Sequence, residues 1–368
     1  MNYFTNLRVC SSHGKAMRTR NLVGRTGFVT LFLATLLVVS LPAVGATILN
    51  VPADYETIQG AIDAAVEEDK VVVSRGIYYE NLDFKGKGIT LTSTNPDNRD
   101  CVENTIIDGA DAAPVVKFVN GEPSTAVLRG MTIQHGHADG GGGGIRCTGS
   151  SPTITKNVIL NNWAKWGAGV RCRDASAQIV GNEIRRNNAK GQGGGLACYG
   201  SPVPTIRNNS ISQNHVENDG GGGIHCGQLT DSRPIIEGNT IKANVAGFGG
   251  GIGCWDEPGP IIRDNVIEGN STHKGGGGGI HVRSSSPDII RNELRSNTAC
   301  LGGGAILCNA GASAIVRDNV IIRNGANVGG GIHCCGQATP EIEGNTIEGN
   351  SASYGGDRKS TRLNSSHR

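Results

Sequence analysis

The sequence predicts an all-β protein, a right-handed parallel β-helix solenoid with a short N-terminal capping helix. Three observations support this fold class: a Gly-rich run that recurs every 25–28 residues, a pair of Asn residues five positions apart in each repeat, and apolar residues spaced by two. A spacing of two places side chains on one face of a strand. One such repeat cannot bury its apolar face alone, so we expect the repeats to stack as coils around a shared core.

Each Gly-rich run ends in an aliphatic residue, and a Cys usually follows two positions later. Both should point into the core, where Cys serves as a small apolar side chain. A metal site is disfavoured because the sulfurs would lie in a row rather than in a tetrahedron. The aliphatic residues are Ile145, Val170, Leu196, Ile224, Ile252, Ile280, Ile306 and Ile332, followed by Cys147, Cys172, Cys198, Cys226, Cys254, Val282, Cys308 and Cys334. Off this ladder, Cys101, Cys300 and Cys335 are the better candidates for disulfide pairing.

Between the two Asn residues of every repeat, one position always holds Ile or Leu. Asn tolerates left-handed backbone angles, so we expect it at bends, with stacked amides hydrogen-bonded along the axis. The first Asn stands at 157, 182, 209, 239, 265, 292, 319 and 345, and the second at 162, 187, 214, 244, 270, 297, 324 and 350. An earlier short strand should direct inward the residues Ile154, Ile206, Ile236, Ile262, Ile290, Val316 and Ile342.

Residues 47–136 are predicted to form an N-terminal cap and the first, less regular coils. Apolar residues from Ile58 to Ala65 have helical spacing, and a short helix there would cover the open end of the core. Strands are expected at 71–73, 89–92 and 105–107. The regular repeats then occupy residues 137–356.

The two ends of the chain are expected to lie outside the folded repeats. Residues 1–46 are interpreted as an upstream segment and a signal peptide, with basic residues before an apolar stretch at 28–41 and small residues at 44–46. This predicts a secreted, extracellular or cell-surface protein, with the periplasm as an alternative. Residues 357–368 match a common sequencing-adapter oligonucleotide read in one frame, so we interpret them as an artefact that truncates the repeats.

Two stretches resemble known families. The segment Ile58-Gln-Gly-Ala-Ile-Asp-Ala-Ala65, with Gly76-Ile-Tyr78 and Gly88-Ile-Thr-Leu91, resembles the opening of pectin-esterase-like proteins of the pectin-lyase fold. Ile241-Lys-Ala-Asn244 followed by Gly249-Gly-Gly-Ile252 resembles the repeats of polymorphic outer-membrane proteins. Together the resemblances cover nearly all of residues 47–356. They imply the fold but no single activity, because this fold hosts lyases, hydrolases, esterases, adhesins and scaffolds.

The sequence does not display a catalytic constellation. Paired carboxylates on adjacent coils would be needed for a hydrolase, whereas Asp256 and Glu257 are neighbours in a turn and Asp139 and Asp219 are isolated. The Gly-rich runs lack the Gly-Lys-Ser/Thr of a phosphate-binding loop. No cofactor or metal is expected, and a net charge of +2 argues against a nucleic-acid partner. We therefore favour a non-enzymatic role.

The outward face beside the Cys ladder carries the candidate ligand-binding residues. The position between each aliphatic residue and its Cys should face solvent, next to a strip of Gly backbone, with Trp163 and Trp166 in flanking turns. We expect the imidazoles to gain charge in mild acid and to strengthen the binding of an acidic polysaccharide or surface glycan. The predicted ligand-binding residues are Arg146, Arg171, His225, His281, His333, Trp255 and Tyr199.

These observations predict an adhesin-like β-helix that presents a long glycan- or ligand-binding face. Two alternatives remain open. One is a polysaccharide lyase, glycoside hydrolase or esterase of the pectin-lyase fold that acts on uronic-acid polymers. The other is a rigid stalk for a C-terminal domain, with an ordinary solvated outer face.

Overall fold

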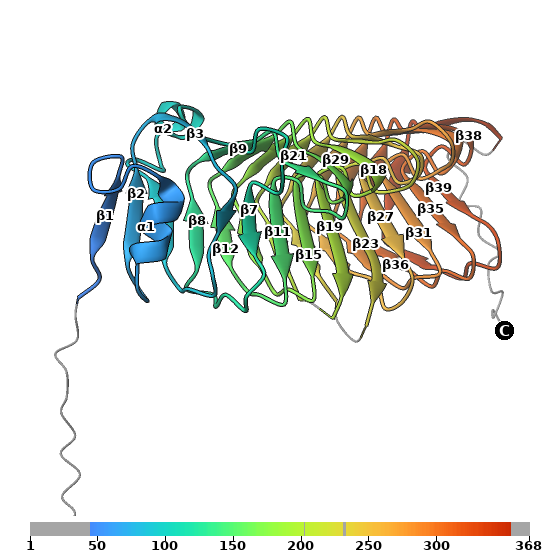
Figure 1. Cartoon of the computed structure of the whole chain (residues 1–368). Helices are drawn as coiled ribbons and strands as arrows, with labels where there is room; N and C mark the ends of the chain where they lie inside the picture. Colours follow the sequence, from blue (N-terminus) through green and yellow to red (C-terminus); the bar gives the residue numbers. More distant parts are fainter. Residues whose placement is uncertain (1–44, 202, 231–232, 355–368) are drawn as a thin grey trace, which may run out of the picture. The chain divides into compact units, whose positions relative to one another are not determined.

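The computed structural model describes residues 45–201, 203–230 and 233–354, which form a parallel β-solenoid (Figure 1). The predicted artefact at 357–368 and nearly all of the predicted signal peptide lie outside these residues. Two helices are described, α1 (Ile58–Ala64) and α2 (Arg99–Glu103). Neither is long and apolar enough to cross a membrane. Helix α1 packs against β1 and β2 as the predicted N-terminal cap, with Ile58, Ala61 and Ile62 buried.

Each regular coil contributes one strand to each of four parallel sheets, which we call A, B, C and D and define below by their strands. Along each coil the chain passes through sheet A, then B, then D and then C. Successive coils pair residue for residue; for example, Ile145 is opposite Val170 and Cys147 is opposite Cys172. Sheet A contains β1 (Ile48–Val51), β2 (Lys70–Val73), β5 (Thr90–Ser93), β8 (Val127–Arg129), β12 (Thr153–Thr155), β16 (Gln178–Val180), β20 (Thr205–Arg207), β24 (Ile235–Glu237), β28 (Ile261–Arg263), β32 (Asp288–Ile290), β36 (Ile315–Arg317) and β40 (Glu341–Glu343).

Sheets B and D supply the two consecutive walls that follow sheet A along each coil. Sheet B contains β3 (Gly76–Tyr79), β6 (Thr105–Asp108), β9 (Thr132–Gln134), β13 (Val158–Leu160), β17 (Glu183–Arg185), β21 (Ser210–Ser212), β25 (Thr240–Lys242), β29 (Val266–Glu268), β33 (Glu293–Arg295), β37 (Val320–Ile322) and β41 (Thr346–Glu348). Sheet D contains β10 (His137–Ala138), β14 (Trp163–Trp166), β18 (Asn188–Gln192), β22 (His215–Val216), β26 (Val245–Ala246), β30 (Ser271–Thr272), β34 (Thr298–Gly302), β38 (Gly325–Val328) and β42 (Ser351–Tyr354).

Sheet C closes each coil and carries the Cys ladder. It contains β4 (Leu82–Asp83), β7 (Val116–Phe118), β11 (Ile145–Thr148), β15 (Val170–Arg173), β19 (Leu196–Gly200), β23 (Ile224–Leu229), β27 (Ile252–Trp255), β31 (Ile280–Arg283), β35 (Ile306–Asn309) and β39 (Ile332–Cys334). Apolar residues from sheets A, B and C meet in one continuous core. One inward position was predicted wrongly: Ile289, not Ile290, is opposite Ile262 and is fully buried, because the turn before β32 is one residue shorter than expected.

The Cys ladder lies in the core as predicted, except at its last member. Six of its seven cysteines are buried, while Cys334 is partly exposed in the last described coil of sheet C. All described cysteines are free, so the structure does not form the disulfides expected for Cys101, Cys300 and Cys335. Cys101 is instead buried, with its sulfur 3.3 Å from the Thr94 hydroxyl.

We expect the ladder cysteines to be unreactive thiols in the folded protein, because water and reagent do not reach their sulfurs. Titration with a thiol reagent should detect few groups under native conditions and at least six more in denaturant without reductant. The six are Cys147, Cys172, Cys198, Cys226, Cys254 and Cys308. Their absence from the unreduced, denatured titration would show that they are oxidised and would contradict this packing.

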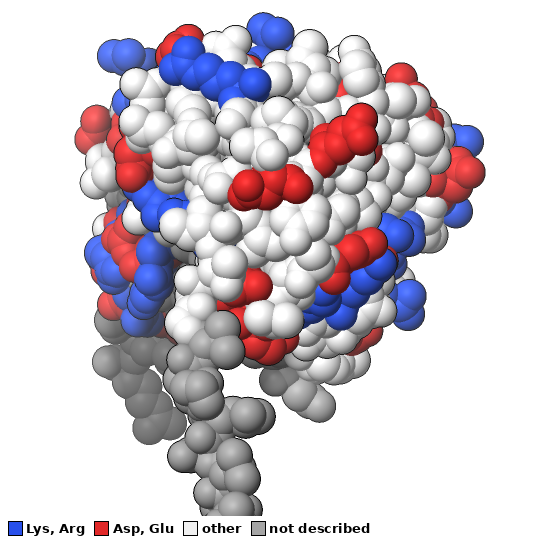
Figure 2. Space-filling model, turned by 60° about the vertical axis from the view of Figure 1, so that its left-hand side comes forward, with Lys and Arg blue, Asp and Glu red and all other residues white. Residues whose placement is uncertain are grey.

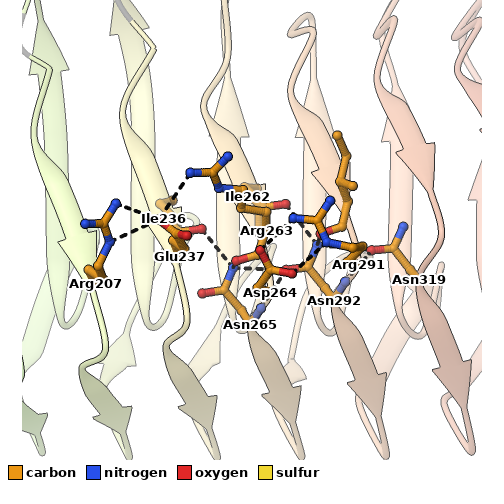
Figure 3. Close-up of polar contacts among 11 residues, drawn as sticks. Arg207, Ile236, Glu237, Ile262, Arg263, Asp264, Asn265, Arg291, Asn292 and Asn319 are labelled. Atoms are coloured by element: carbon orange, nitrogen blue, oxygen red, sulfur yellow. Dashed lines mark hydrogen bonds and ion pairs between the residues drawn. The ribbon is translucent and has the colours of Figure 1, made fainter.

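Two Asn ladders run along the corners on either side of sheet B. Each buried amide donates to the Oδ1 of the next Asn, as Asn265 Nδ2 does to Asn292 at 2.9 Å (Figure 3). The predicted ladders are therefore confirmed, but the predicted backbone reason is wrong. Positive φ occurs at the residue before each Asn, such as Asp264 at 57° and Gly269 at 61°. Asn is present because its side-chain amide forms hydrogen bonds to backbone groups of the preceding coil and to the Asn side chain of the next coil, as Asn265 does.

The predicted strip of bare Gly backbone is not exposed. The Gly before each aliphatic residue of sheet C is buried and faces the second Asn ladder. A Cβ on Gly251 would lie 2.6 Å from Gly279 O, 3.1 Å from Ile267 Cγ2 and 3.2 Å from Asn270 Nδ2. Gly is therefore required here by the close approach of the next coil, and the strip cannot serve as a ligand platform.

The corners of the coil differ in how strictly their length is kept. From β8 onwards, the corner between sheets A and B separates the inward residues by five positions, as from Ile154 to Ile159. The earlier corner between β5 and β6 is longer and contains α2. The corners on either side of sheet C vary: Val170 and Ile179 are nine positions apart, whereas Ile224 and Ile236 are twelve apart. Among the regular coils, length variation is thus confined to the corners that flank sheet C.

Candidate functional site

A cleft lies on the outer face of sheet C, between the two variable corners. Its volume is about 560 Å³, and small-molecule sites typically range from about 300 to 1,000 Å³. Three successive coils form it, through the end of β14, strands β15 and β19, and the corner that follows β23. The lining residues are Trp166, Arg171, Arg173, Asp174, Gln192, Tyr199, Gly200, Gln228 and Thr230.

The Arg171 guanidinium lies between two aromatic rings of this cleft. Its Cζ is 5.8 Å from the ring centroid of Trp166 and 5.8 Å from that of Tyr199. Its Nε is buried without a hydrogen-bond partner, and among the described residues no carboxylate lies within ion-pair distance of it. Burial lowers the pKa of this guanidinium below its usual value. Because a desolvated cation without a counter-charge is unfavourable, the site is suited to an anion.

Arginines on the outer faces of other sheets differ from Arg171 in having carboxylate partners. On sheet A, Arg207 Nη2 is 2.7 Å from Glu237 Oε2, and nearby Arg291 Nη2 is 2.8 Å from Asp264 Oδ2 (Figure 3). Such exposed pairs contribute little to stability but leave no charge unpaired. Arg171, which is half-buried and has no carboxylate partner, therefore differs from the ion-paired arginines on the other sheets.

A hydrogen-bonded chain holds the opposite wall of the cleft. Tyr199 donates its hydroxyl proton to Gln192 Oε1 at 2.9 Å, and Gln192 Nε2 donates to Asp219 Oδ2 at 2.9 Å. Burial raises the pKa of the Tyr199 hydroxyl, so this group keeps its proton. Burial also raises the pKa of the Asp219 carboxyl. These bonds position the Tyr199 ring and leave Gln192 as an oriented polar group on the cleft wall.

The structure brings only part of the predicted ligand-binding set together. Arg171 and Tyr199 line the cleft, as does Trp166. Trp163 and Trp166 do not lie in a turn as predicted, because they are the two ends of strand β14. Arg146 is opposite Arg171 in the sheet, but its Nε donates to Gly141 O at 2.9 Å and it does not line the cleft. His333 is partly exposed, far along sheet C from these residues.

The prediction that His225 and His281 face solvent is wrong. Their exposed fractions are 1% and 2%. Aromatic rings cover them: Trp255 lies edge-on to both histidines, at 5.1 Å and 6.1 Å between ring centroids, and Phe248 stacks on His281. Burial lowers the pKa of His225 to about 3 and that of His281 to about 4. As long as they stay buried, both are therefore neutral in mild acid, and they do not supply the predicted charge to a ligand.

Several cleft residues were missed in the sequence. Arg173 and Tyr199 are opposite each other, two positions beyond Arg171 and Ala197. An extension of the outward row by two residues would have found Arg173. Gln192 ends β18, Gln228 lies near the end of β23 and Thr230 follows β23, beyond the periodic positions that could guide a prediction. In the described residues, no group of three or more His, Cys, Asp or Glu side chains is arranged to hold a metal ion.

One comparison with known proteins, a family model, agrees with this architecture. A family model described as the right handed beta helix region matches residues 77–231, 143–299 and 229–365. No curated protein matches the chain. A solved structure that matches is the catalytic unit of the thermostable GH87 alpha-1,3-glucanase from Streptomyces thermodiastaticus strain HF3-3, at 14% identity and a TM-score of 0.27, covering 82% of this chain and 67% of that chain.

The matched segments overlap and together span most of the repeats, in agreement with the parallel pairing of all four sheets. The chain therefore belongs to the right-handed β-helix family.

Proposed function

We propose that this chain is a secreted or cell-surface binding protein that holds an acidic saccharide in the cleft on sheet C. The observation that carries the proposal is Arg171, a half-buried cation without a carboxylate partner, placed between Trp166 and Tyr199. A guanidinium fits a carboxylate with two parallel hydrogen bonds. The apolar segment at 28–41, which resembles a signal peptide, supports export.

The other lining groups suit a sugar ring that carries a carboxylate. The partly exposed Trp166 ring offers an apolar face of the kind on which the C–H groups of a sugar pack, whereas the buried Tyr199 ring shapes the cleft wall. Gln192, Gln228 and Thr230 provide amide and hydroxyl groups for hydrogen bonds to sugar hydroxyls. A uronic acid combines both requirements, with one anionic group and several hydroxyls on one ring.

Recognition of the anion would be local rather than a result of the charge of the whole protein. The net charge is +2. On the face drawn in Figure 2, Lys and Arg are interspersed with Asp and Glu rather than gathered in one field. Long-range steering of a polyanion is therefore weak, and we expect affinity to depend on contacts within the cleft.

We expect Arg171→Ala to weaken the binding of a galacturonic acid trimer by about thirtyfold, or about 2 kcal/mol, because the carboxylate loses its charged partner. Isothermal titration calorimetry at pH 7.5 measures this. Arg146→Ala is the matched control: it removes the same side chain from the opposite position of the adjacent coil, outside the cleft, and should bind like the parent.

Trp166→Ala should also weaken binding, and a neutral glucose trimer should bind weakly to every variant. If no acidic oligosaccharide binds the parent protein, or if Arg146→Ala and Arg171→Ala have equal effects, the cleft is not the site. The stalk interpretation would then be favoured.

A further inference from the structure

A continuous row of rings extends from the wall of the cleft along the outer face of sheet C. Tyr199, which lines the cleft, contacts His225 with ring centroids 5.7 Å apart. His225 contacts Trp255 at 5.1 Å, Trp255 contacts His281 at 6.1 Å, and His281 stacks on Phe248 at 5.6 Å. We name these five residues the ring row. Its members come from four strands, β19, β23, β27 and β31, and from the corner before β27.

The ring row has few polar partners for its nitrogen atoms. Nδ1 of His225, Nδ1 of His281 and Nε1 of Trp255 are all buried without a hydrogen-bond partner. Among the described residues, the ring-row nitrogen with a hydrogen-bond partner is His281 Nε2, 3.2 Å from Asn309 Oδ1. His225 is enclosed by backbone, since a Cβ on Gly227 would lie 2.6 Å from its Nε2 and a Cβ on Gly253 would lie 3.2 Å from its Nδ1.

The charged groups around the ring row do not favour an imidazolium. Arg171 lies over Tyr199 from β15, and Arg283 lies over Trp255 from β31, with its Cζ 5.7 Å from the ring centroid. Asp219, from the corner before β23, interacts with Tyr199 and Arg283 but has Gln192 as its hydrogen-bond partner.

One further charged group on the adjacent corners is Lys274, which interacts with Asp219. The partly exposed His333 lies two coils beyond His281 on the same sheet. Among the described residues, neither His225 nor His281 forms an ion pair with a carboxylate. Each would therefore acquire a buried charge without compensation on protonation.

We propose that the ring row makes ligand binding in the cleft sensitive to acid, because protonation of His225 and His281 forces their rings into water and withdraws the support of Tyr199. This inference rests on the proposed function of the cleft. Tyr199 links the two features, because it lines the cleft and its ring also contacts His225. The Trp255 indole covers Gly220 in the adjacent corner.

The direction of the pH effect follows from the burial of both imidazoles. Burial holds the pKa of His225 at about 3 and that of His281 at about 4, below the 6.5 of an exposed His. In an opened ring row the two imidazoles are exposed and bind protons at the ordinary His pKa of about 6.5, whereas in the closed row they bind protons only at a lower pH. The closed arrangement is therefore fully favoured above pH 6.5 and loses stability progressively as the pH falls from 6.5 towards 4 and 3.

The test compares binding of the galacturonic acid trimer at pH 7.5 and pH 4.5 in the full chain. We expect the parent to bind at least about tenfold more weakly at pH 4.5. The double variant His225→Phe/His281→Phe keeps the rings without a titratable nitrogen, so it should lose less than about threefold. His215→Gln/His273→Gln is the matched control and should behave like the parent. These histidines also stand two coils apart, but both are exposed and outside the ring row: His215 is on β22 and His273 directly follows β30.

A second measurement needs neither the trimer nor the variants of His225 and His281. The chain has three Trp residues, so Trp163→Phe/Trp166→Phe leaves Trp255 as the only indole. Quenching of its fluorescence by iodide should be weak at pH 7.5 and rise as the pH falls to 4.5.

The outcomes separate the two proposals. A parent that fails to bind the trimer at pH 7.5 contradicts the proposed function, and the quenching of Trp255 still decides whether acid opens the ring row. Quenching that does not change with pH, or a Phe double variant with the same loss of affinity as the parent, overturns the acid-sensitive ring row.

Discussion

Replacement of Asn265 by Leu is expected to lower the free energy of unfolding by about 4 kcal/mol, because it leaves several buried polar groups without partners. The side chain is 1% exposed and lies in the middle of its ladder (Figure 3). Its Nδ2 donates to Ile236 O, Arg263 O and Asn292 Oδ1, each at 2.9 Å. Its Oδ1 accepts from the backbone N–H and the amide of Asn239, at 2.9 and 3.0 Å. Leu has a similar volume but restores none of these bonds.

Asn345→Leu is the matched control at the last described position of the same ladder. Asn345 still bonds Asn319 and Val316, but it is partly exposed, so water can replace much of what is lost. We expect a loss of about 1–2 kcal/mol. Urea unfolding followed by circular dichroism measures both variants. Equal, negligible losses at the two positions would mean that the Asn residues only occupy corners and do not hold the coils together.

Gly251→Val should destabilise the protein by about 3 kcal/mol or more, since the side chain has no space between the coils. The Cβ would lie 2.6 Å from the backbone oxygen of Gly279, which cannot move without disturbing the next coil. One methyl group is accommodated at the equivalent position of a later coil, where Ala305 is fully buried. The two further methyl groups of Val would meet the Ile267 side chain and the Asn270 amide, so the strain should far exceed that of Gly251→Ala.

Gly325→Val provides the comparison for this change. Gly325 is on β38, where a Cβ would meet only Ser351 Oγ at 3.3 Å and Thr298 Cγ2 at 3.9 Å. Val favours extended backbone, so the change in the free energy of unfolding should remain within about 0.5 kcal/mol. Thermal unfolding of the two variants decides the matter: similar midpoints would show that the Gly residues before sheet C are not required for packing.

Much of the fold could be predicted because the stacking imposes a strict repeat on the inward residues. The Ile of sheets A and B, the Cys of sheet C and the two Asn ladders each recur at one position per coil, and they face the core as expected. The reason for the Gly positions could not be predicted in the same way. A spacing rule separates the two faces of a strand, but it does not show how closely the next coil approaches the backbone at Gly251.

The candidate site was predicted only in part, for a related physical reason. Alternation correctly placed Arg171, His225 and His281 on the outer face of sheet C. It did not show that Trp255 and Phe248 cover the two imidazoles, because those contacts depend on side-chain directions and on a corner of irregular length. The rings beside Arg171 likewise come from the ends of strands, Trp166 from β14 and Tyr199 from β19, where the repeat pattern of the sequence is weakest.

The unequal corners have a consequence for how such a chain can change over time. An extra residue between Ile236 and Ile241 would displace Asn239 from both neighbouring amides, and so would disrupt three coils at once. An extra residue beside the exposed Asp256 and Glu257, in the corner between β27 and β28, would only lengthen that corner, at a cost of roughly a few tenths of a kcal/mol. Insertions are therefore tolerated where the cleft is built and rejected where the ladders run. A lineage of such proteins can acquire new ligand specificities by altering two loops per turn, while its scaffold is inherited unchanged.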